Sequence, residues 1–184
     1  DGTMVGLFTT NEATANGAAT EVGGYYKDGR WHYLEDCAIL NGMSDNGQYF
    51  AGASYKNGIC YAATWNINGE KTIWAEGIVG KAYDVTNGGT MACGWGNHHL
   101  KANRTPTLWA PDSIMLDYNN IGPNSLAWSF SPNGKKVLGD FVIYDVETKE
   151  KTKIDISQFV GFKLYRVTNE GVAVGEYMRG FGDM

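Results

Sequence analysis

One glycine-bearing segment recurs along the 184 residues, and it constrains the fold more than any other feature. In each complete copy a large apolar residue is followed by Ser or Thr, two turn residues and Gly. The complete copies are residues 43–47, 85–89, 130–134 and 167–171, and residues 2–6 resemble the second half of the same unit. The leading glycines, at positions 2, 47, 89, 134 and 171, are 45, 42, 45 and 37 residues apart. A repeat of this length indicates one supersecondary unit used several times.

The repeated segment has the chemistry of a β-hairpin. An apolar strand ends at a Ser or Thr whose hydroxyl can bond to the turn backbone, and Gly supplies the positive φ of a tight turn. A second strand then closes on another glycine, at positions 52, 94, 139 and 175. A second apolar hairpin follows in each unit, over residues 24–34, 63–74, 107–116 and 142–154. The sequence therefore predicts about four strands in every 42 to 45 residues.

This pattern predicts an all-β fold, a β-propeller-like array of four-stranded antiparallel blades in a single domain over residues 1–184. The expected units are 1–36 (partial), 37–77, 78–119, 120–159 and 160–184 (partial). They make about four blades if the two partial units combine to close a ring. The partial units carry one second-strand motif too many for that, which favours a segment of a larger propeller. A β-sandwich is the rival all-β hypothesis, and the long repeat period argues against it.

The unit resembles the HAF-type repeats of bacterial extracellular proteins. The resemblance rests on an apolar strand ending in Ser/Thr-x-Asn-Gly, a second strand ending in Gly, and a Trp-bearing third strand with a further turn. Residues 40–69 and 82–112 match best, whereas the 121–150 unit has Tyr144 in place of Trp. The resemblance implies a β-propeller and a bacterial, extracytoplasmic location (secreted, periplasmic or cell surface). It implies no catalytic residues.

Composition excludes several classes of function. The net charge of -5 and the scattered Lys and Arg residues do not suit a nucleic-acid-binding protein. No apolar run is long enough for a membrane span, so a lipid anchor would lie outside this chain. The chain begins without Met, which suggests a removed leader or a piece of a longer protein. Cys37, Cys60 and Cys93 lack CxxC spacing, so we expect free thiols. Cys60 and Cys93 lie in apolar strand patterns and are expected to be buried. One disulfide with an odd thiol is the alternative.

Reactive residues form no recognisable constellation in the sequence, so we predict no catalytic residues, no metal site and no cofactor. His98 and His99 are adjacent and would point to opposite faces of a strand, which does not suit a shared metal. No Gly-x-Ser-x-Gly nucleophile motif occurs. Paired carboxylates at the propeller mouth, as glycosidases use, are the remaining route to an enzyme, and Asp140 is among the candidates.

The aromatic residues are the best candidates for binding. Trp95 precedes an irregular loop, residues 96–106, and loops on a rigid scaffold are where binding usually resides. The predicted binding residues are Trp95, His98, His99, Lys101 and Arg104. By contrast, Trp65, Trp109, Tyr26 and Tyr144 recur in phase with the repeat, and we expect them to pack between blades.

We therefore predict a non-enzymatic binding or scaffolding propeller outside the cytoplasm of a bacterial cell. Its ligand would be a protein or a glycan, and open blade edges could associate with the rest of a larger protein. The alternative is a carbohydrate-active enzyme domain with acidic residues at the propeller mouth.

Overall fold

A computed structural model describes residues 2–13, 19–97, 104–111, 114–115, 126–159 and 161–178. Every regular element in these residues is a β-strand, and every strand pair is antiparallel. The predicted all-β class is therefore confirmed. The predicted hairpins over 24–34, 63–74, 107–116 and 142–154 are confirmed as well, since each pairs two consecutive strands.

The strands fall into consecutive sheet units. The first unit contains β1 (Met4–Ala13), β2 (Ala19–Lys27) and β3 (Arg30–Tyr33). The second contains β4 (Cys37–Met43), β5 (Tyr49–Lys56), β6 (Ile59–Asn66) and β7 (Lys71–Ile73), and the third contains β8 (Val79–Val85), β9 (Ala92–Asn97), β10 (Thr105–Trp109) and β11 (Ile114–Met115). The fourth contains β12 (Ala127–Phe130), β13 (Lys136–Gly139), β14 (Val142–Asp145) and β15 (Lys151–Lys153), and the fifth contains β16 (Gly161–Val167) and β17 (Ala173–Met178).

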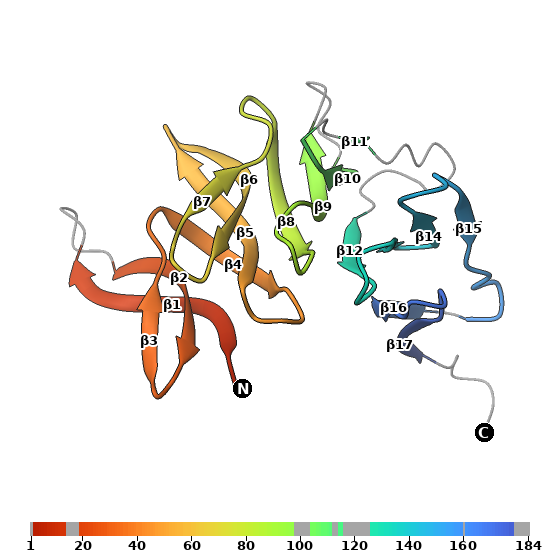
Figure 1. The fold of residues 1–184 in the computed structure, drawn as a ribbon, viewed down its shortest axis with the longest axis horizontal. Coiled ribbons are helices and arrows are strands. Elements are labelled where there is room, and N and C mark those ends of the chain that lie inside the picture. The colour runs from red at the N-terminus through yellow and green to blue at the C-terminus, as the bar shows by residue number, and fades with distance from the viewer. Residues whose placement is uncertain are drawn as a thin grey trace.

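These units follow one another in a curved row (Figure 1). The first strands of the units, β4, β8, β12 and β16, lie toward the middle of the molecule, and β7, β11 and β15 lie outside. A bridge between Tyr61 and Val79 joins the second and third units into one eight-stranded sheet. In the described residues, β16–β17 and β1–β3 remain separate sheets and do not form one blade.

The repeated turns adopt one geometry. All five leading glycines have positive φ, between 67° and 87°, which explains why the sequence places Gly there. In the second unit the Gly47 amide donates to the Ser44 carbonyl oxygen, and the Ser44 hydroxyl oxygen accepts the Tyr49 amide at 3.0 Å. Thr86 and Ser131 accept in the same way, and Thr168 accepts the amide of Val172, one residue earlier in its turn. The Ser/Thr-to-Gly signature is thus a closed hairpin turn.

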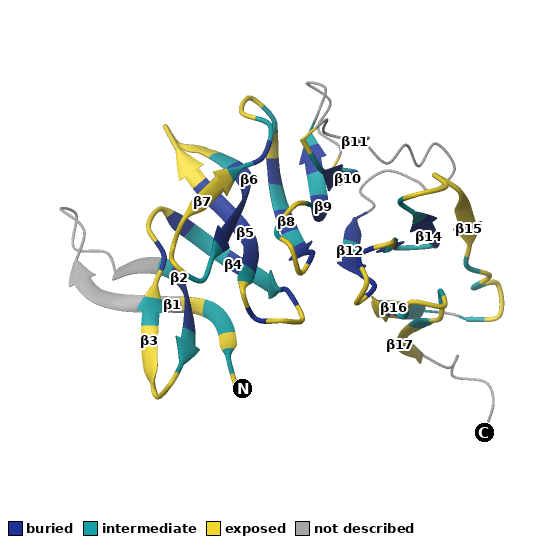
Figure 2. Cartoon of the chain, in the orientation of Figure 1, coloured by how far each residue is buried: buried dark blue, intermediate teal, exposed yellow. Residues whose placement is uncertain are grey.

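The apolar core lies between consecutive units, as the dark blue segments in Figure 2 show. Trp65, Trp109 and Tyr144 on the third strands are almost fully buried and pack against the preceding unit, as expected. Tyr26 differs from this expectation. It pairs with Met4 on the face of β1–β2 turned away from the second unit, so it is only half-buried and Met4 is 54% exposed. Tyr25 contacts the second unit instead, stacking on Phe50.

All three cysteines are free thiols. Cys37 and Cys93 are buried, whereas Cys60 is only half-buried, which corrects the expectation for that residue. Burial raises the pKa of each thiol, to about 12 for Cys37. The described structure therefore contains no disulfide, and the disulfide alternative is wrong.

Candidate functional site

A bulge occurs at the same place in β4, β8, β12 and β16, the first strands of the second to fifth units. The pairing with the second strand skips one residue, three positions before the Ser or Thr of the turn. The skipped residues are Asn41, Tyr83, Trp128 and Tyr165. A bulge re-aims the side chain of the extra residue, and bulges are frequent next to functional sites. Three of the four skipped side chains are aromatic, and we call Tyr83, Trp128 and Tyr165 the bulge aromatics.

Two of the bulge aromatics, from the third and fourth units, meet. Tyr83 and Trp128 stack with their ring centroids 5.1 Å apart, and both side chains are partly exposed. The Trp128 indole N–H donates to Asp140 Oδ1 at 2.5 Å, while Asp140 Oδ2 accepts the Leu126 amide at 3.0 Å. Burial raises the pKa of Asp140, although these two donors oppose the shift. Asp140 thereby fixes the orientation of the Trp128 ring.

The predicted binding residues lie beside this stack as far as they are described. The Arg104 guanidinium sits 5.0 Å from the centroid of the Trp95 ring, at cation–π distance. Trp95 is half-buried, so only part of its side chain is accessible to a ligand. Both residues influence Tyr83: burial raises its pKa, and the proximity of Trp95 and Arg104 opposes the rise. His98, His99 and Lys101 lie outside the described residues.

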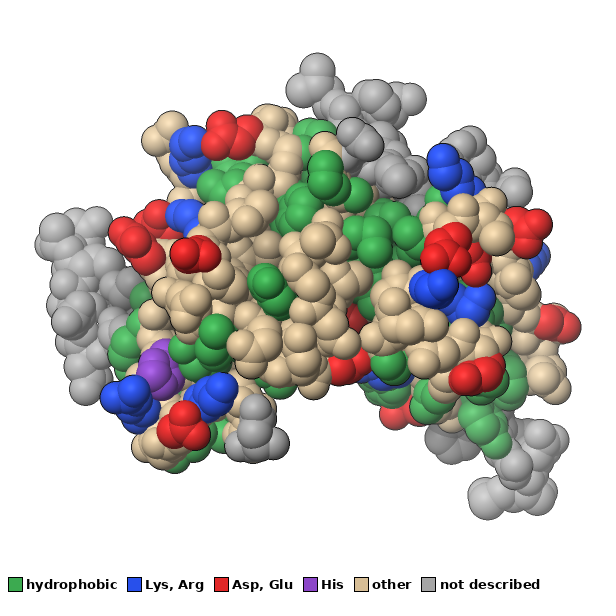
Figure 3. All heavy atoms as spheres, in the orientation of Figure 1, with side chains coloured by type: hydrophobic (Ala, Val, Ile, Leu, Met, Phe, Trp, Pro, Cys, Tyr) green, Lys and Arg blue, Asp and Glu red, His purple; other side chains and the backbone are tan. Residues whose placement is uncertain are grey.

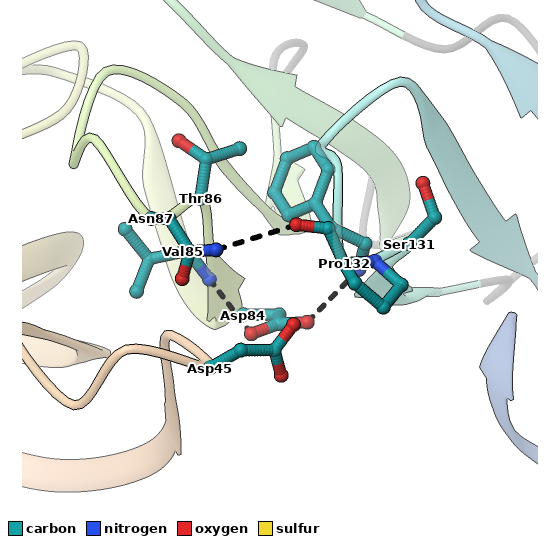
Figure 4. Close-up of a pocket in the computed structure, with 8 residues that line it drawn as sticks. Asp45, Asp84, Val85, Thr86, Asn87, Ser131 and Pro132 are labelled. Atoms are coloured by element: carbon teal, nitrogen blue, oxygen red, sulfur yellow. Dashed lines mark hydrogen bonds between the residues drawn. The ribbon is translucent and has the colours of Figure 1, made fainter. Parts of the chain in front are cut away.

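Asp84, in β8, is a second polar feature and connects three units; Figure 4 shows its hydrogen bonds within the third unit and to the fourth. Its Oδ1 accepts the Val85 amide at 2.9 Å, and its Oδ2 accepts the Phe130 amide at 2.9 Å. Arg166 Nη1, from the fifth unit, lies 3.2 Å from the same Oδ2. Asp84 is 4% exposed, and this burial raises its pKa to about 6. A carboxylate held by three donors acts as a brace between the units.

The space around Asp84 is small. Asp45 and Asp84 line one cavity together with residues of the 84–87 and 130–132 segments, and its volume is about 10 Å³. That is room for about one water molecule. A wider cleft of about 540 Å³ lies between Asp45 and the fifth unit, where Arg166 and Glu170 line it.

The repeated turns contact each other from unit to unit. The Asn46 amide donates to Asn87 Oδ1 at 3.0 Å, and Asn46 Nδ2 donates to the Asn87 carbonyl oxygen at 2.9 Å. Asn87 Nδ2 donates to the Pro132 carbonyl oxygen at 3.3 Å, and the Asn133 amide donates to Asn169 Oδ1 at 3.0 Å. These bonds form a ladder of turns across four units.

Other classes of site receive no support in the described part of the chain. Within it, no three His, Cys, Asp or Glu side chains gather as metal ligands would. No helix among the described residues has the length and apolar character to cross a bilayer. On the face shown in Figure 3, acidic and basic side chains lie in mixed groups toward the two ends of the molecule.

The sequence alone did not single out Tyr83, Trp128 or Asp84 for these positions. The signal for Asp84 was present, because an acidic residue interrupts the apolar strand Ala82–Val85 and must find donors there. The bulge left a fainter signal. The residue three positions before the turn Ser or Thr is aromatic in three units, but its direction depends on the strand pairing.

No family model matches the sequence, and no curated protein matches it, so the resemblance to HAF-type repeats stays a prediction. Among solved structures, the chain is similar to the crystal structure of TolB from Acinetobacter baumannii, with a TM-score of 0.55 and 14% sequence identity. The match covers 96% of this chain and 52% of the TolB chain. The chain thus spans about half the length of that structure, and the likeness concerns the fold alone.

Proposed function

We propose that this chain is a non-enzymatic binding or scaffolding module with a β-propeller-like architecture, and that it binds a glycan or a protein at the bulge aromatics. The observation that carries the proposal is the partly exposed stack of Tyr83 on Trp128 at a bulge repeated in every first strand. Aromatic rings of this kind bring large contact area at low entropic cost. Asp140 and the Trp95–Arg104 pair surround the stack with polar groups that can orient a ligand.

The propeller-like architecture has two supports. The sheet units follow one another with their first strands toward the middle, and the fold resembles the TolB structure. The location outside the cytoplasm of a bacterial cell rests on the resemblance to HAF-type repeats.

The carbohydrate-active enzyme is the second candidate, and the raised pKa of Asp84 favours it, because a general acid needs such a shift. Two observations favour the brace instead. Both Asp84 oxygens already accept hydrogen bonds, one from its own strand and the other from the next unit, and the adjoining cavity of about 10 Å³ leaves no room for a sugar. An acid that never reaches its substrate cannot protonate it.

Binding to a glycan panel and to a displayed peptide library tests the proposal. We expect the wild-type chain to bind members of one set, and Trp128→Ala or Tyr83→Ala to weaken this binding about fivefold to tenfold, the contribution of one aromatic contact. Tyr55→Ala is the matched control, since Tyr55 is 59% exposed in β5 and belongs to no bulge.

Three results would contradict the proposal. They are no binding by the wild-type chain, equal loss in Tyr55→Ala, and hydrolysis of a bound glycan that Asp84→Asn abolishes. Hydrolysis would be detected as new reducing ends by mass spectrometry, and it would favour the enzyme alternative.

A further inference from the structure

The outer edge of β17 is a different surface from the bulge aromatics and carries an inference of its own. In the described residues β17 pairs on one side only, with β16. Every other second strand that follows a first strand has a third strand on its far side: β5 pairs with β6, β9 with β10 and β13 with β14. In the second, third and fourth units, a third strand therefore covers the edge that is open in β17.

The register of these pairs is constant. Two residues before the closing glycine, each second strand has a residue opposite the aromatic side chain of the third strand. The pairs are Phe50 with Trp65, Ala92 with Trp109, and Val137 with Tyr144.

Ala173 occupies this place in β17, two residues before Gly175. The equivalence is structural as well. A Cβ on Gly175 would collide with the Lys163 carbonyl oxygen, and one on Gly94 would collide with that of Lys81 in the same way. An added strand would thus place its aromatic residue opposite Ala173.

A hollow of about 220 Å³ lies at this position. Its walls come from β16–β17 and from the segment after β15; they include Ala173, Leu164, Phe162, Ile154, Ile156 and Phe159. Leu164, Ile154 and Ala173 also pack on the core formed by Leu138 and Ile143 of the fourth unit. In the complete units, the corresponding space between neighbouring sheets holds Trp109 or Tyr144, both almost fully buried.

We propose that the free edge of β17 binds an extended polypeptide strand, pairing antiparallel with it, and that a Trp or Tyr of this strand fills the hollow beside Ala173. The occupant has the chemistry of β6, β10 and β14: a strand with an aromatic residue at one defined position. The backbone hydrogen bonds of the pair supply affinity, and the aromatic pocket supplies specificity. Tyr177, 51% exposed beside the hollow, gains cover from the added strand.

A synthetic peptide with the sequence of residues 59–74, the β6–β7 hairpin, is the probe. We expect it to bind the 184-residue chain and to slow amide hydrogen exchange in β17 at least about tenfold. The same peptide with Trp65→Ser should bind much more weakly. In the chain, Ala173→Trp fills the hollow and should abolish binding, whereas Val174→Trp lies on the opposite face of β17 and should leave binding intact.

A fused copy of residues 59–74 after residue 184 raises the effective concentration and serves as the second measurement. The proposal is wrong if neither the peptide nor the fusion protects β17, or if the Trp65→Ser versions protect it equally. A chain that dimerises alone, and loses the dimer through Ala173→Trp, would show that the occupant is a second copy and overturn the proposed partner.

Discussion

Asp84 shows how one residue can hold neighbouring sheets together. It accepts hydrogen bonds from the backbone of its own unit and the next, and from Arg166 in the unit after that. Burial still raises its pKa to about 6, because the lost hydration outweighs these donors. The folded chain therefore binds a proton at Asp84 more tightly than the unfolded chain does.

This shift has a definite consequence for stability against pH. Between the unfolded pKa of 3.8 and the folded pKa of about 6, the folded state binds more protons, so this residue makes stability fall as pH rises. The decrease is about 3 kcal/mol across the window. Urea unfolding at pH 4 to 7 should show that the wild-type chain loses stability relative to Asp84→Asn by up to this amount. A difference between the two chains that stays constant with pH would contradict the assignment.

The closing glycines work by close approach of two backbones. A Cβ at Gly94 would lie against the Lys81 carbonyl oxygen, so we expect Gly94→Ala to cost about 1–3 kcal/mol of unfolding free energy. Gly88 is the control, because an added Cβ there meets nothing closer than 3.9 Å. Gly88→Ala should leave stability unchanged or raise it slightly. Thermal unfolding compares the two, and equal effects would rule out the close approach as the cause.

At the scale of the strands, the hairpins were predictable and the bulges were not. A turn such as residues 44–47 depends on four neighbouring residues, so Ser, Asn and Gly at fixed spacing suffice to identify it. The bulge at Tyr83 depends on how β8 pairs with β9, and no residue type near Tyr83 indicates that the pairing skips this residue. The prediction of the site was limited for the same reason. The sequence indicated Trp95 and Arg104, whereas Trp128 and Asp140 are brought to the same site only by the strand pairing.

The third-strand aromatics should contribute more to stability than equally large exposed side chains. Trp65 is 1% exposed in the core between the first two units, and its truncation to Ala should cost about 3–5 kcal/mol. Tyr55→Ala, at a side chain 59% exposed, should cost less than about 0.5 kcal/mol. Denaturant unfolding provides the comparison, and a small effect at Trp65 would show that the units do not depend on this packing.

Across the whole molecule, each unit packs mainly on its neighbours in the row. The stability of such an array is close to a sum of unit and interface contributions, and the units at the ends have only one interface. Exposed apolar side chains at the two ends of the row include Met4, Val172 and Val174, each more than half exposed.

Native-state hydrogen exchange should therefore rank the units by the free energy of their local opening. We expect amides of β5, β6 and β9 to exchange only through global unfolding, and amides of β1, β16 and β17 to exchange through local opening at lower free energy. The order should persist in low denaturant. Uniform protection along the row would instead indicate a single cooperative unit.

Because the turns of neighbouring units are bonded to each other, the two kinds of hairpin differ in how well they tolerate inserted residues. Asn87 is bonded to the turn before it and the turn after it, so residues inserted between Thr86 and Gly89 would separate three units at once. The tips at residues 66–70 and 145–150 bond mostly within their own hairpins and are largely exposed. A tag, a label or a whole inserted domain should therefore be placed at those tips, where it leaves the bonds between neighbouring units intact.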